Sequence, residues 1–355
     1  MPTLKDVARE ANVAPITVSR VVSGNGYVKP ETAARVQQAI RRLGYTPNRA
    51  ASSLVTGRTL SIGMVVPDVS YPFFTDIVLG AEVVASEHGY NLILCNTSEN
   101  LARELTILNF LREARVDGVI MCSPRSEDTV LLPALALHRA FVLVNHPGLG
   151  TLGGCVRSNH LQGATLAVQH LVANARKHIA FMCGPERIPT AQERSRGYVH
   201  ALKNANYPVD PSLIVPYTAN LPAGMTSQGE WLQSVPAGSL EWNRIRSTLG
   251  SLGARALLTA RPDVDGIICY SDQIAVGALQ ACQDLGRRVP EDVALVGSND
   301  LPIASQVTPA LTTLRIPTYE MGASAARLLL ERLADRAPQN EIVLPHELIV
   351  RASAP

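Results

Sequence analysis

The spacing of apolar residues changes once along the chain, near residue 58. Before that point apolar residues recur every three or four positions, which is the period of an amphipathic helix. Beyond it, short continuous apolar runs alternate with segments of helical period, as expected of strands buried on both faces and the helices that join them. The pattern therefore predicts a small helical unit at the amino end and a larger α/β unit after it.

Three short helices are predicted in the first unit, at residues 4–11, 15–23 and 30–43. Only Asn12-Val13-Ala14 separates the first two, which is the spacing of a helix-turn-helix. Thr3 followed by Asp6 is typical of a capping box, and Pro15 suits the first turn of a helix. Gly44 is placed to end the third helix. The unit has the organisation of a helix-turn-helix domain that places its second helix in a DNA major groove.

Three sequence motifs carry a resemblance to a known family: Thr3-Leu-Lys-Asp-Val-Ala, Thr17-Val-Ser-Arg-Val, and Leu43-Gly-Tyr-x-Pro-Asn-x-x-Ala-x-x-Leu54. They resemble the signature of the lactose-repressor (LacI/GalR) family of bacterial transcription regulators. The resemblance implies a homodimer in which each subunit reads one half of a palindromic operator. It also implies a hinge helix in the minor groove, with Leu54 wedged between the two central base pairs.

The DNA-contacting residues expected from the helix faces and from the resemblance are Thr3, Lys5, Pro15, Ile16, Thr17, Ser19, Arg20, Tyr27, Lys29, Asn48, Arg49, Ala51 and Leu54. Residues 1–58 hold nine Lys and Arg against three Asp and Glu, a net +6, which leaves −4 for the rest of a chain whose total is +2. This basic excess suits a phosphate backbone. A solvated basic helical trio is the alternative. Because Pro15 and Ile16 offer no side-chain hydrogen bond, base preference there would come from apolar contact and DNA shape.

Eight strands are predicted after residue 58, at 61–66, 90–95, 118–122, 140–144, 178–183, 212–215, 266–270 and 293–296. Helices are predicted between and after them, near 74–88, 101–115, 126–137, 160–173, 191–205, 246–260, 272–285 and 318–335. This alternation predicts two doubly wound parallel sheets. Such sheets bind ligands beyond the carboxyl ends of their strands, so two facing sheets would form a cleft.

The resemblance extends through this second unit, whose fold would be that of the periplasmic sugar-binding proteins. The expected domains are a helix-turn-helix domain at 1–46, a hinge at 47–59, and a core at 60–355 that binds an effector and dimerises. In that fold the chain crosses between the two subdomains three times, here near 157–159, 290 and 317–320. The expected amino-terminal subdomain is then 60–158 with 291–318, and the carboxyl-terminal one 159–290 with 319–355.

The candidate effector-binding residues follow predicted strands: Phe73, Phe74, Asn145, Thr190, Arg194 and Asp272. An arginine fork and a carboxylate facing each other across a cleft can hold vicinal hydroxyls or a polar ring, and an aromatic wall can cover its apolar face. Taken singly, Phe73 and Phe74 would be core residues, Asp272 a helix cap, and Arg194 a solvated helix residue. Gly297-Ser298-Asn299-Asp300 departs from the family's Gly-[FY]-Asp-Asp, and the segment 219–245, with Trp231 and Trp242, is longer than usual.

Composition excludes several classes of function. The chain of 355 residues is 46 % hydrophobic, but no run approaches the ~18 consecutive apolar residues of a membrane span, and the first residues lack a signal-peptide core. The six cysteines have no metal-ligand spacing and read as reduced core residues. Phosphate-loop, dinucleotide-binding and nucleophile-elbow motifs are missing from the sequence. We therefore expect a cytoplasmic protein that is no enzyme and needs no metal or cofactor.

The sequence thus predicts a ligand-responsive transcriptional regulator, in the form of a repressor, that binds a palindromic operator as a homodimer. A sugar, a sugar derivative or a nucleobase-like molecule in the cleft would change its operator affinity. The alternative is a sugar-binding receptor without a regulatory role on DNA. Sequence does not identify the effector or say whether it releases or recruits DNA binding.

Overall fold

The computed structural model describes residues 2–24, 26–46, 57–146, 153–217, 240–336 and 340–355. The chain divides into two compact units, Met1–Thr59 and Leu60–Pro355. Four of the expected DNA-contacting residues, Asn48, Arg49, Ala51 and Leu54, lie outside the described residues, as does Trp231.

The described residues of the first unit form three helices, as the apolar spacing predicts: α1 (Leu4–Glu10), α2 (Pro15–Ser23) and α3 (Pro30–Leu43). The predicted capping box is present, because the Thr3 hydroxyl accepts from the Asp6 amide while the Asp6 carboxylate accepts from the Thr3 amide at 2.9 Å. Val7, Val18 and Val36, one from each helix, are fully buried against one another. These small side chains let the three helices cross closely.

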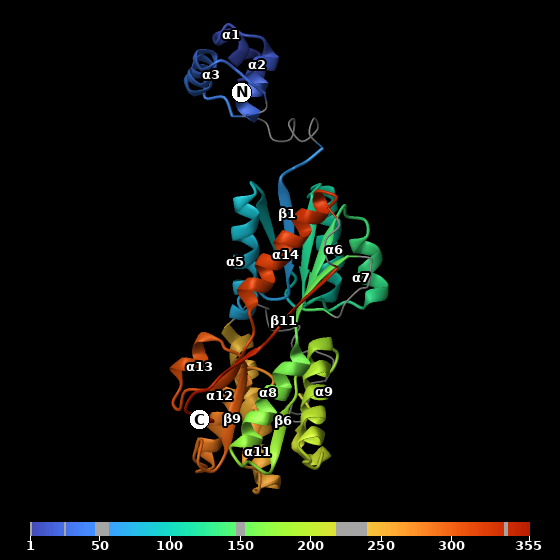
Figure 1. Cartoon of the computed structure of the whole chain (residues 1–355), viewed down its shortest axis with the longest axis vertical. Coiled ribbons are helices and arrows are strands. Elements are labelled where there is room, and N and C mark those ends of the chain that lie inside the picture. The colour runs from blue at the N-terminus through green and yellow to red at the C-terminus, as the bar shows by residue number, and fades with distance from the viewer. Residues whose placement is uncertain (1, 25, 47–56, 147–152, 218–239, 337–339) are drawn as a thin grey trace. The chain divides into compact units, whose positions relative to one another are not determined.

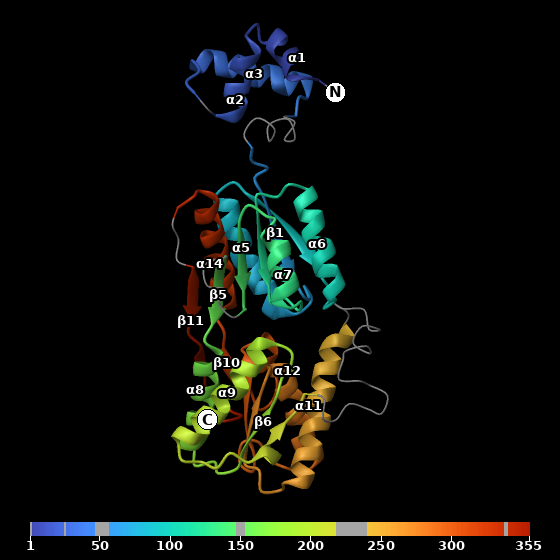
Figure 2. The ribbon, with the colours of Figure 1, turned by 90° about the vertical axis from the view of Figure 1, so that its right-hand side faces the viewer.

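The second unit contains two six-stranded sheets, one in each of two lobes (Figures 1 and 2). In the first lobe the strand order is β11-β5-β4-β3-β1-β2, and every pairing is parallel. In the second lobe it is β12-β10-β9-β8-β6-β7, with only β12 antiparallel. The strands are β1 (Ser61–Val66), β2 (Asn91–Asn96), β3 (Gly118–Cys122), β4 (Phe141–Val144), β5 (Gly154–Ser158), β6 (Ile179–Met182), β7 (Ile214–Val215), β8 (Gly266–Cys269), β9 (Ala294–Asn299), β10 (Thr312–Arg315), β11 (Glu341–Leu344) and β12 (Glu347–Ile349).

Helices cover both faces of each sheet. They are α5 (Pro72–Glu87), α6 (Leu101–Glu113), α7 (Asp128–Leu135), α8 (His160–Ala173), α9 (Pro189–Asn204), α11 (Leu240–Ala260), α12 (Asp272–Asp284), α13 (Pro302–Gln306) and α14 (Thr318–Leu333), with a short 3₁₀ turn η1 (Pro211–Leu213). Alternate residues of β1 point to opposite faces: Ile62 and Met64 join the cluster with α5 and α14, whereas Val65 joins the cluster with α6 and α7. The predicted doubly wound fold is confirmed.

Within the described residues the chain crosses between the lobes at β5–α8, β10–α14 and β11–β12, and the last crossing is visible as the long red ribbon in Figure 1. The first two crossings match the prediction, but the third lies at Pro345–His346 and not near Pro290. The expected assignment of 291–318 to the first lobe is therefore wrong, and so is that of 319–344 to the second, whereas β12 and the residues after it do lie in the second lobe. β9 and β10 continue the second sheet beside β8, while α14 and β11 return to the first. Apolar spacing shows that a segment is a strand, but not which of two similar sheets it joins.

Close backbone contact joins α5 to α14 in the first lobe, and α11 to α12 and α8 to α9 in the second. A Cβ at Gly80 would lie 2.0 Å from the carbonyl oxygen of Tyr319, and one at Gly322 would lie 1.8 Å from that of Ile77. Gly277 stands in the same relation to Ser247 in the second lobe. Glycine is required at these positions because the neighbouring backbone occupies the space of a side chain. Within the described residues, no helix combines the length and apolar character that a membrane crossing requires.

Candidate functional site

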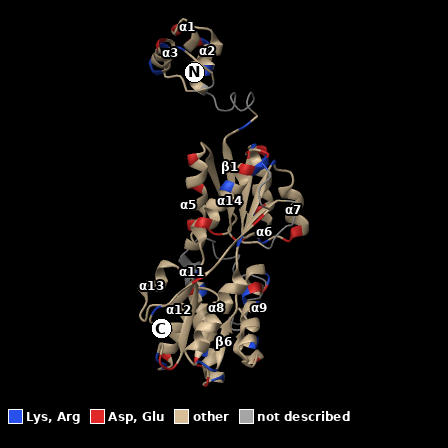
Figure 3. Cartoon of the chain, in the orientation of Figure 1, with Lys and Arg blue, Asp and Glu red and all other residues tan. Residues whose placement is uncertain are grey.

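The outer face of α2 presents the side chains predicted to contact DNA. Pro15, Ile16 and Arg20 are exposed, with Ile16 at 59 %, while Thr17 and Ser19 are half-buried. Thr3, Lys5 and Lys29 are also exposed, and Tyr27 is 84 % exposed. Basic residues lie on all three helices, as Figure 3 shows. An exposed Ile and Tyr beside exposed cations form a surface with both apolar and charged contacts to offer a nucleic acid.

Some of the charged side chains of the first unit form ion pairs within that unit. Arg42 forms a 3.0 Å ion pair with Glu10, which ties α3 to α1, and Arg9 pairs with Asp6 on α1. The hydrogen bonds from Thr3 lower the pKa of the Asp6 carboxyl, so it is ionised at neutral pH. Thr3 is therefore engaged in the helix cap, whatever further contact it makes.

In the second unit, Arg194 lies at the junction of the lobes. It is 6 % exposed, and α9 brings its guanidinium to groups that follow three other elements. One terminal nitrogen donates to the Tyr270 carbonyl, the other donates to the Asn299 amide oxygen at 3.4 Å, and Nε donates to His160 Nδ1 at 3.3 Å. The guanidinium also lies 4.5 Å from the centroid of the Tyr270 ring. Burial lowers the pKa of Arg194, but its ordinary value is so high that the cation persists.

His160 links that arginine to the first lobe. Its Nε2 lies 2.8 Å from the side-chain oxygen of Asn145, which follows β4, and the Asn145 amide donates to Ser123 Oγ at 2.9 Å. Because Nδ1 accepts from Arg194, the ring must be neutral with its proton on Nε2. Burial, together with the charge of Arg194, holds the pKa of His160 well below its usual range, in agreement with a neutral ring.

His346, from the third crossing, adds a further contact at the junction of the lobes. Its ring meets that of His160 edge-on, with centroids 5.1 Å apart, and its Nε2 lies 3.1 Å from Ser158 Oγ in the first crossing. A Cβ at Gly163 would lie 2.2 Å from His346 Nδ1, so α8 can pack against this ring only because residue 163 is a glycine. Burial lowers the pKa of His346 to about 3, which leaves this ring neutral as well.

Five of the six predicted effector residues fall into two groups. Arg194, Asn145 and the buried Thr190 lie at or near the lobe junction. Phe73 and Phe74 are 5 % and 4 % exposed and belong to the core cluster of the first lobe, where they contact the ring of Tyr71.

The expectation that Arg194 and Asp272 face each other across a cleft is wrong, because α9 and α12 both belong to the second lobe. Asp272 is fully buried. Its oxygens accept from the Thr313 hydroxyl at 2.5 Å and from the Leu301 amide at 2.7 Å. Burial raises the pKa of Asp272 to about 7, against the opposing effect of those two hydrogen bonds. Asp272 thus holds the loop after β9, the strand that ends at Asn299.

Four residues outside the predicted effector set complete the junction: Tyr71, Arg246, Asn299 and His160. The Asn299 amide donates to the Tyr71 hydroxyl at 2.8 Å, and the Arg246 guanidinium lies 4.4 Å from the Tyr71 ring centroid. Tyr71 precedes the recognised Phe73-Phe74 pair, and Asn299 is part of the noted departure Gly297-Ser298-Asn299-Asp300. Their places in these two segments could have marked Tyr71 and Asn299 as candidate site residues. We call Tyr71, Arg194, Arg246, Tyr270, Asn299 and His160 the inter-lobe cluster.

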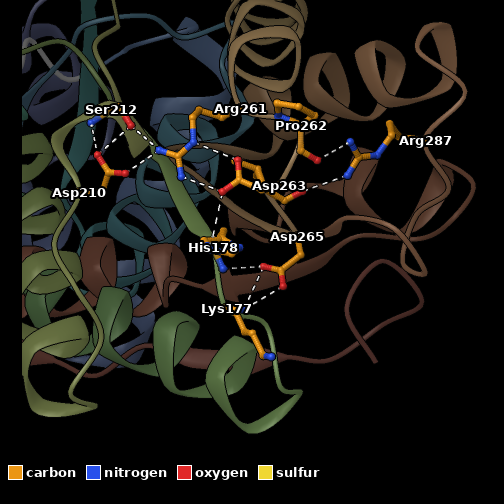
Figure 4. A network of polar contacts seen from close by, with 10 residues as sticks. Lys177, His178, Asp210, Ser212, Arg261, Pro262, Asp263, Asp265 and Arg287 are labelled. Atoms are coloured by element: carbon orange, nitrogen blue, oxygen red, sulfur yellow. Dashed lines mark hydrogen bonds and ion pairs between the residues drawn. The ribbon is translucent and has the colours of Figure 1, made fainter.

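A separate polar network lies at the amino ends of β6 and β8, whereas the inter-lobe cluster lies at the carboxyl ends of the strands (Figure 4). Arg261 bridges Asp210, at 2.5 Å, and Asp263, at 2.8 Å, and lowers the pKa of Asp263 to about 2. Asp265 accepts from the backbone amides of Lys177 and His178. These acids are occupied by cations and amides in fixed turns, and no group of three or more potential metal ligands occurs among the described residues. The network stabilises turns.

Comparison with known proteins follows the division of the chain. Residues 3–48 match the model of bacterial regulatory proteins of the lacI family. Residues 59–237 match that of periplasmic binding proteins and the sugar-binding domain of the LacI family, and 168–354 match a periplasmic binding protein-like domain. The ribose operon repressor of Halalkalibacterium halodurans is 33 % identical over 99 % of this chain and 96 % of its own length.

The chain belongs to the LacI family of bacterial regulatory proteins. Among solved structures, a transcriptional regulator CelR–cellobiose complex is 31 % identical, with a TM-score of 0.69 over 99 % of this chain and 100 % of that one. A lac repressor dimer bound to operator shares the fold, with a TM-score of 0.84 at 24 % identity over 99 % of both chains. Like its named relatives, this LacI-family chain is a transcriptional regulator and not an enzyme.

Proposed function

We propose that this LacI-family regulator is a repressor that binds a palindromic operator as a homodimer and changes its operator affinity when a small polar effector occupies the inter-lobe cluster. Its relatives include proteins named for ribose and for purine repression, and a structure with cellobiose, which supports an effector of the sugar, sugar-derivative or nucleobase type. We further propose residues 1–46 as the DNA-binding domain, 47–59 as the hinge, and the cytoplasm as the site of action.

One observation carries the effector proposal: a buried arginine that is connected to both lobes. Arg194 donates directly within the second lobe and, through His160, reaches Asn145 in the first. A ligand that accepts hydrogen bonds from the guanidinium would change the contacts that fix the orientation of one lobe relative to the other. Charge-assisted hydrogen bonds of this kind are among the stronger polar interactions available to a ligand hydroxyl or carbonyl.

The DNA part of the proposal is tested with Arg20. We expect Arg20→Ala to weaken binding to a palindromic duplex, selected from a randomised inverted-repeat pool, by roughly 5- to 150-fold, since a lost contact of this kind costs about 1–3 kcal/mol. Mobility shift at fixed salt measures the loss. Arg336→Ala removes the same charge from an exposed site on the second unit and should leave affinity unchanged. Equal losses in both variants would show that only overall charge matters.

The dimer is tested at an exposed apolar surface near the free edge of the first sheet. Leu79 and Val83, one turn apart on α5, are 51 % and 38 % exposed, Leu94 on the edge strand β2 is 42 % exposed, and Phe110 on α6 is 52 % exposed. We expect Leu94→Glu to convert the dimer to a monomer, because a buried unpaired carboxylate is costly. Sedimentation velocity measures the change. Leu137→Glu, at a residue after α7 that is 60 % exposed, should remain dimeric. A Leu94→Glu dimer would move the interface elsewhere.

A further inference from the structure

Tyr71 belongs to the first lobe, yet the second lobe binds its side chain as a receptor binds a ligand. The ring is 7 % exposed. Arg246 of α11 covers a face of the ring, with its guanidinium carbon 4.4 Å from the centroid, and Asn299 donates to the hydroxyl oxygen at 2.8 Å. On its own lobe, Phe73 stacks on the ring at 6.2 Å and Phe74 meets it edge-on at 5.9 Å.

The donor that meets the Tyr71 hydroxyl is oriented by its neighbours. Arg194 donates to the Asn299 side-chain oxygen at 3.4 Å, which turns the amide nitrogen toward Tyr71. Asn299 also has a backbone φ of 108°, a conformation that residues other than glycine rarely adopt. Strained residues of this kind cluster at ligand-binding and switch regions. Burial raises the pKa of Tyr71 to about 12, so the phenol is neutral at physiological pH.

These contacts define what the space around Tyr71 recognises. A cation over a ring face favours an aromatic π-system, and the two phenylalanine rings add apolar and edge contacts. The Asn299 amide requires an oxygen acceptor at one end of that ring. A sugar would satisfy the amide, but it has no π-face for the guanidinium.

We propose that Tyr71 is an internal substitute for the effector and that it fills a subsite for a hydroxylated aromatic ring. The effector's ring enters as Tyr71 leaves, and the contacts of Arg246 and Asn299 pass from the tyrosine to the ligand. The two lobes are thereby released from their direct link through Tyr71 and are joined through the ligand. This inference rests on the proposed effector site and narrows its ligand to a flat ring that bears an oxygen.

Chemical complementation tests the subsite. Tyr71→Gly removes the whole side chain, whose shape is that of p-cresol, and glycine is well tolerated at the start of α5, where Tyr71 is the N-cap. Deletion of a buried ring leaves a cavity that a matching small molecule can fill. We expect millimolar p-cresol to raise the melting temperature of Tyr71→Gly by about 2 °C or more and to leave the wild type unchanged.

Toluene, which lacks the hydroxyl, should stabilise the variant less than p-cresol. Asn299→Ala in the Tyr71→Gly background should abolish that preference, since it removes the donor. A Tyr71→Gly protein that ignores p-cresol, or that responds equally to toluene, overturns the proposal. DNA affinity enters none of these measurements, so failure here is distinguishable from failure of the proposed repressor function.

Tyr71→Phe keeps the packing ring and serves if the glycine variant does not fold. It loses only the hydroxyl that joins the lobes, so amide hydrogens of residues 297–301 should exchange faster in it than in the wild type. Unchanged exchange in that segment would mean that the hydroxyl does not hold the lobes, and the proposal would fail.

Discussion

Asp272→Asn is expected to make the protein more stable than the wild type at pH 8 and equally stable near pH 4. Burial raises the pKa of Asp272 from 3.8 to about 7. A group with a raised pKa in the folded state contributes stability that is fully present below pH 3.8 and is lost as the pH rises through about 7. At about 1.4 kcal/mol per pKa unit the wild type loses up to about 4 kcal/mol over that interval, and the variant loses none of it.

Asparagine suits this position because it has the hydrogen-bonding pattern of the neutral acid. Its amide oxygen can accept from the Leu301 amide, and its NH₂ can donate to the Thr313 hydroxyl. Asp272→Ala is the contrasting variant: it leaves both partners buried without a bond, at about 1–3 kcal/mol each. Urea unfolding at several pH values measures the free energies. A wild type that gains stability between pH 5 and pH 8 relative to Asp272→Asn would mean that the ionised carboxylate is the stabilising form.

The regular elements could be predicted because burial dictates their composition. Runs such as residues 62–66 and Gly118–Cys122 are apolar throughout, since parallel strands between two helical layers meet no water. The helices of the first unit have small apolar residues on one face; α1 begins at the Thr3 capping box, and α2 and α3 begin at a proline and end at a glycine in the left-handed conformation. Local chemistry of this kind is written in consecutive residues.

The strands β5, β10, β11 and β12 escaped prediction. β11 and β12 are edge strands that are partly open to solvent and carry charged residues, whereas β5 and β10 are buried over most of their length but contain polar residues, as in the Thr-Thr-Leu-Arg of β10. The need for glycine at position 277 could not be predicted either, since only the fold brings the Ser247 carbonyl oxygen to within 1.9 Å of where a Cβ would lie. Long-range contacts decide such positions.

The candidate site was recognisable in part. The rule that ligands bind beyond the carboxyl ends of strands pointed to Arg194, Asn145 and Asp272, each of which follows a strand in the chain. It could not say which groups would meet. Asp272 forms hydrogen bonds within its own lobe. Asn299, from the segment that departs from the family's Gly-[FY]-Asp-Asp, joins Arg194 to Tyr71. Their meeting depends on the crossings, one of which had been misplaced.

His160→Leu is expected to uncouple the effector from DNA while leaving effector-free DNA binding intact. The variant removes the acceptor for Arg194 Nε and the donor for Asn145, the two bonds through which the lobes meet at this point. Effectors of two-state regulators typically change affinity by about 5- to 150-fold. In His160→Leu that ratio should fall to within about two-fold. Operator affinity is measured with and without the compound that most stabilises the wild type in a thermal-shift screen of sugars, nucleobases and phenols.

His170→Leu is the matched control for this experiment. His170 lies on the same helix, and its Nε2 lies 2.8 Å from the carbonyl oxygen of Ala354 and 3.3 Å from the side-chain nitrogen of Asn174, but both of these partners belong to the second lobe. Both variants lose a buried or half-buried imidazole contact from α8, so a general loss of stability should affect the effector response of both. A response lost only in His160→Leu, while the compound still raises the melting temperature of that variant, identifies the contact between lobes as the coupling element. Loss of that thermal shift as well would instead show that His160 is needed to bind the effector. A full response in His160→Leu would exclude that contact as the coupling element.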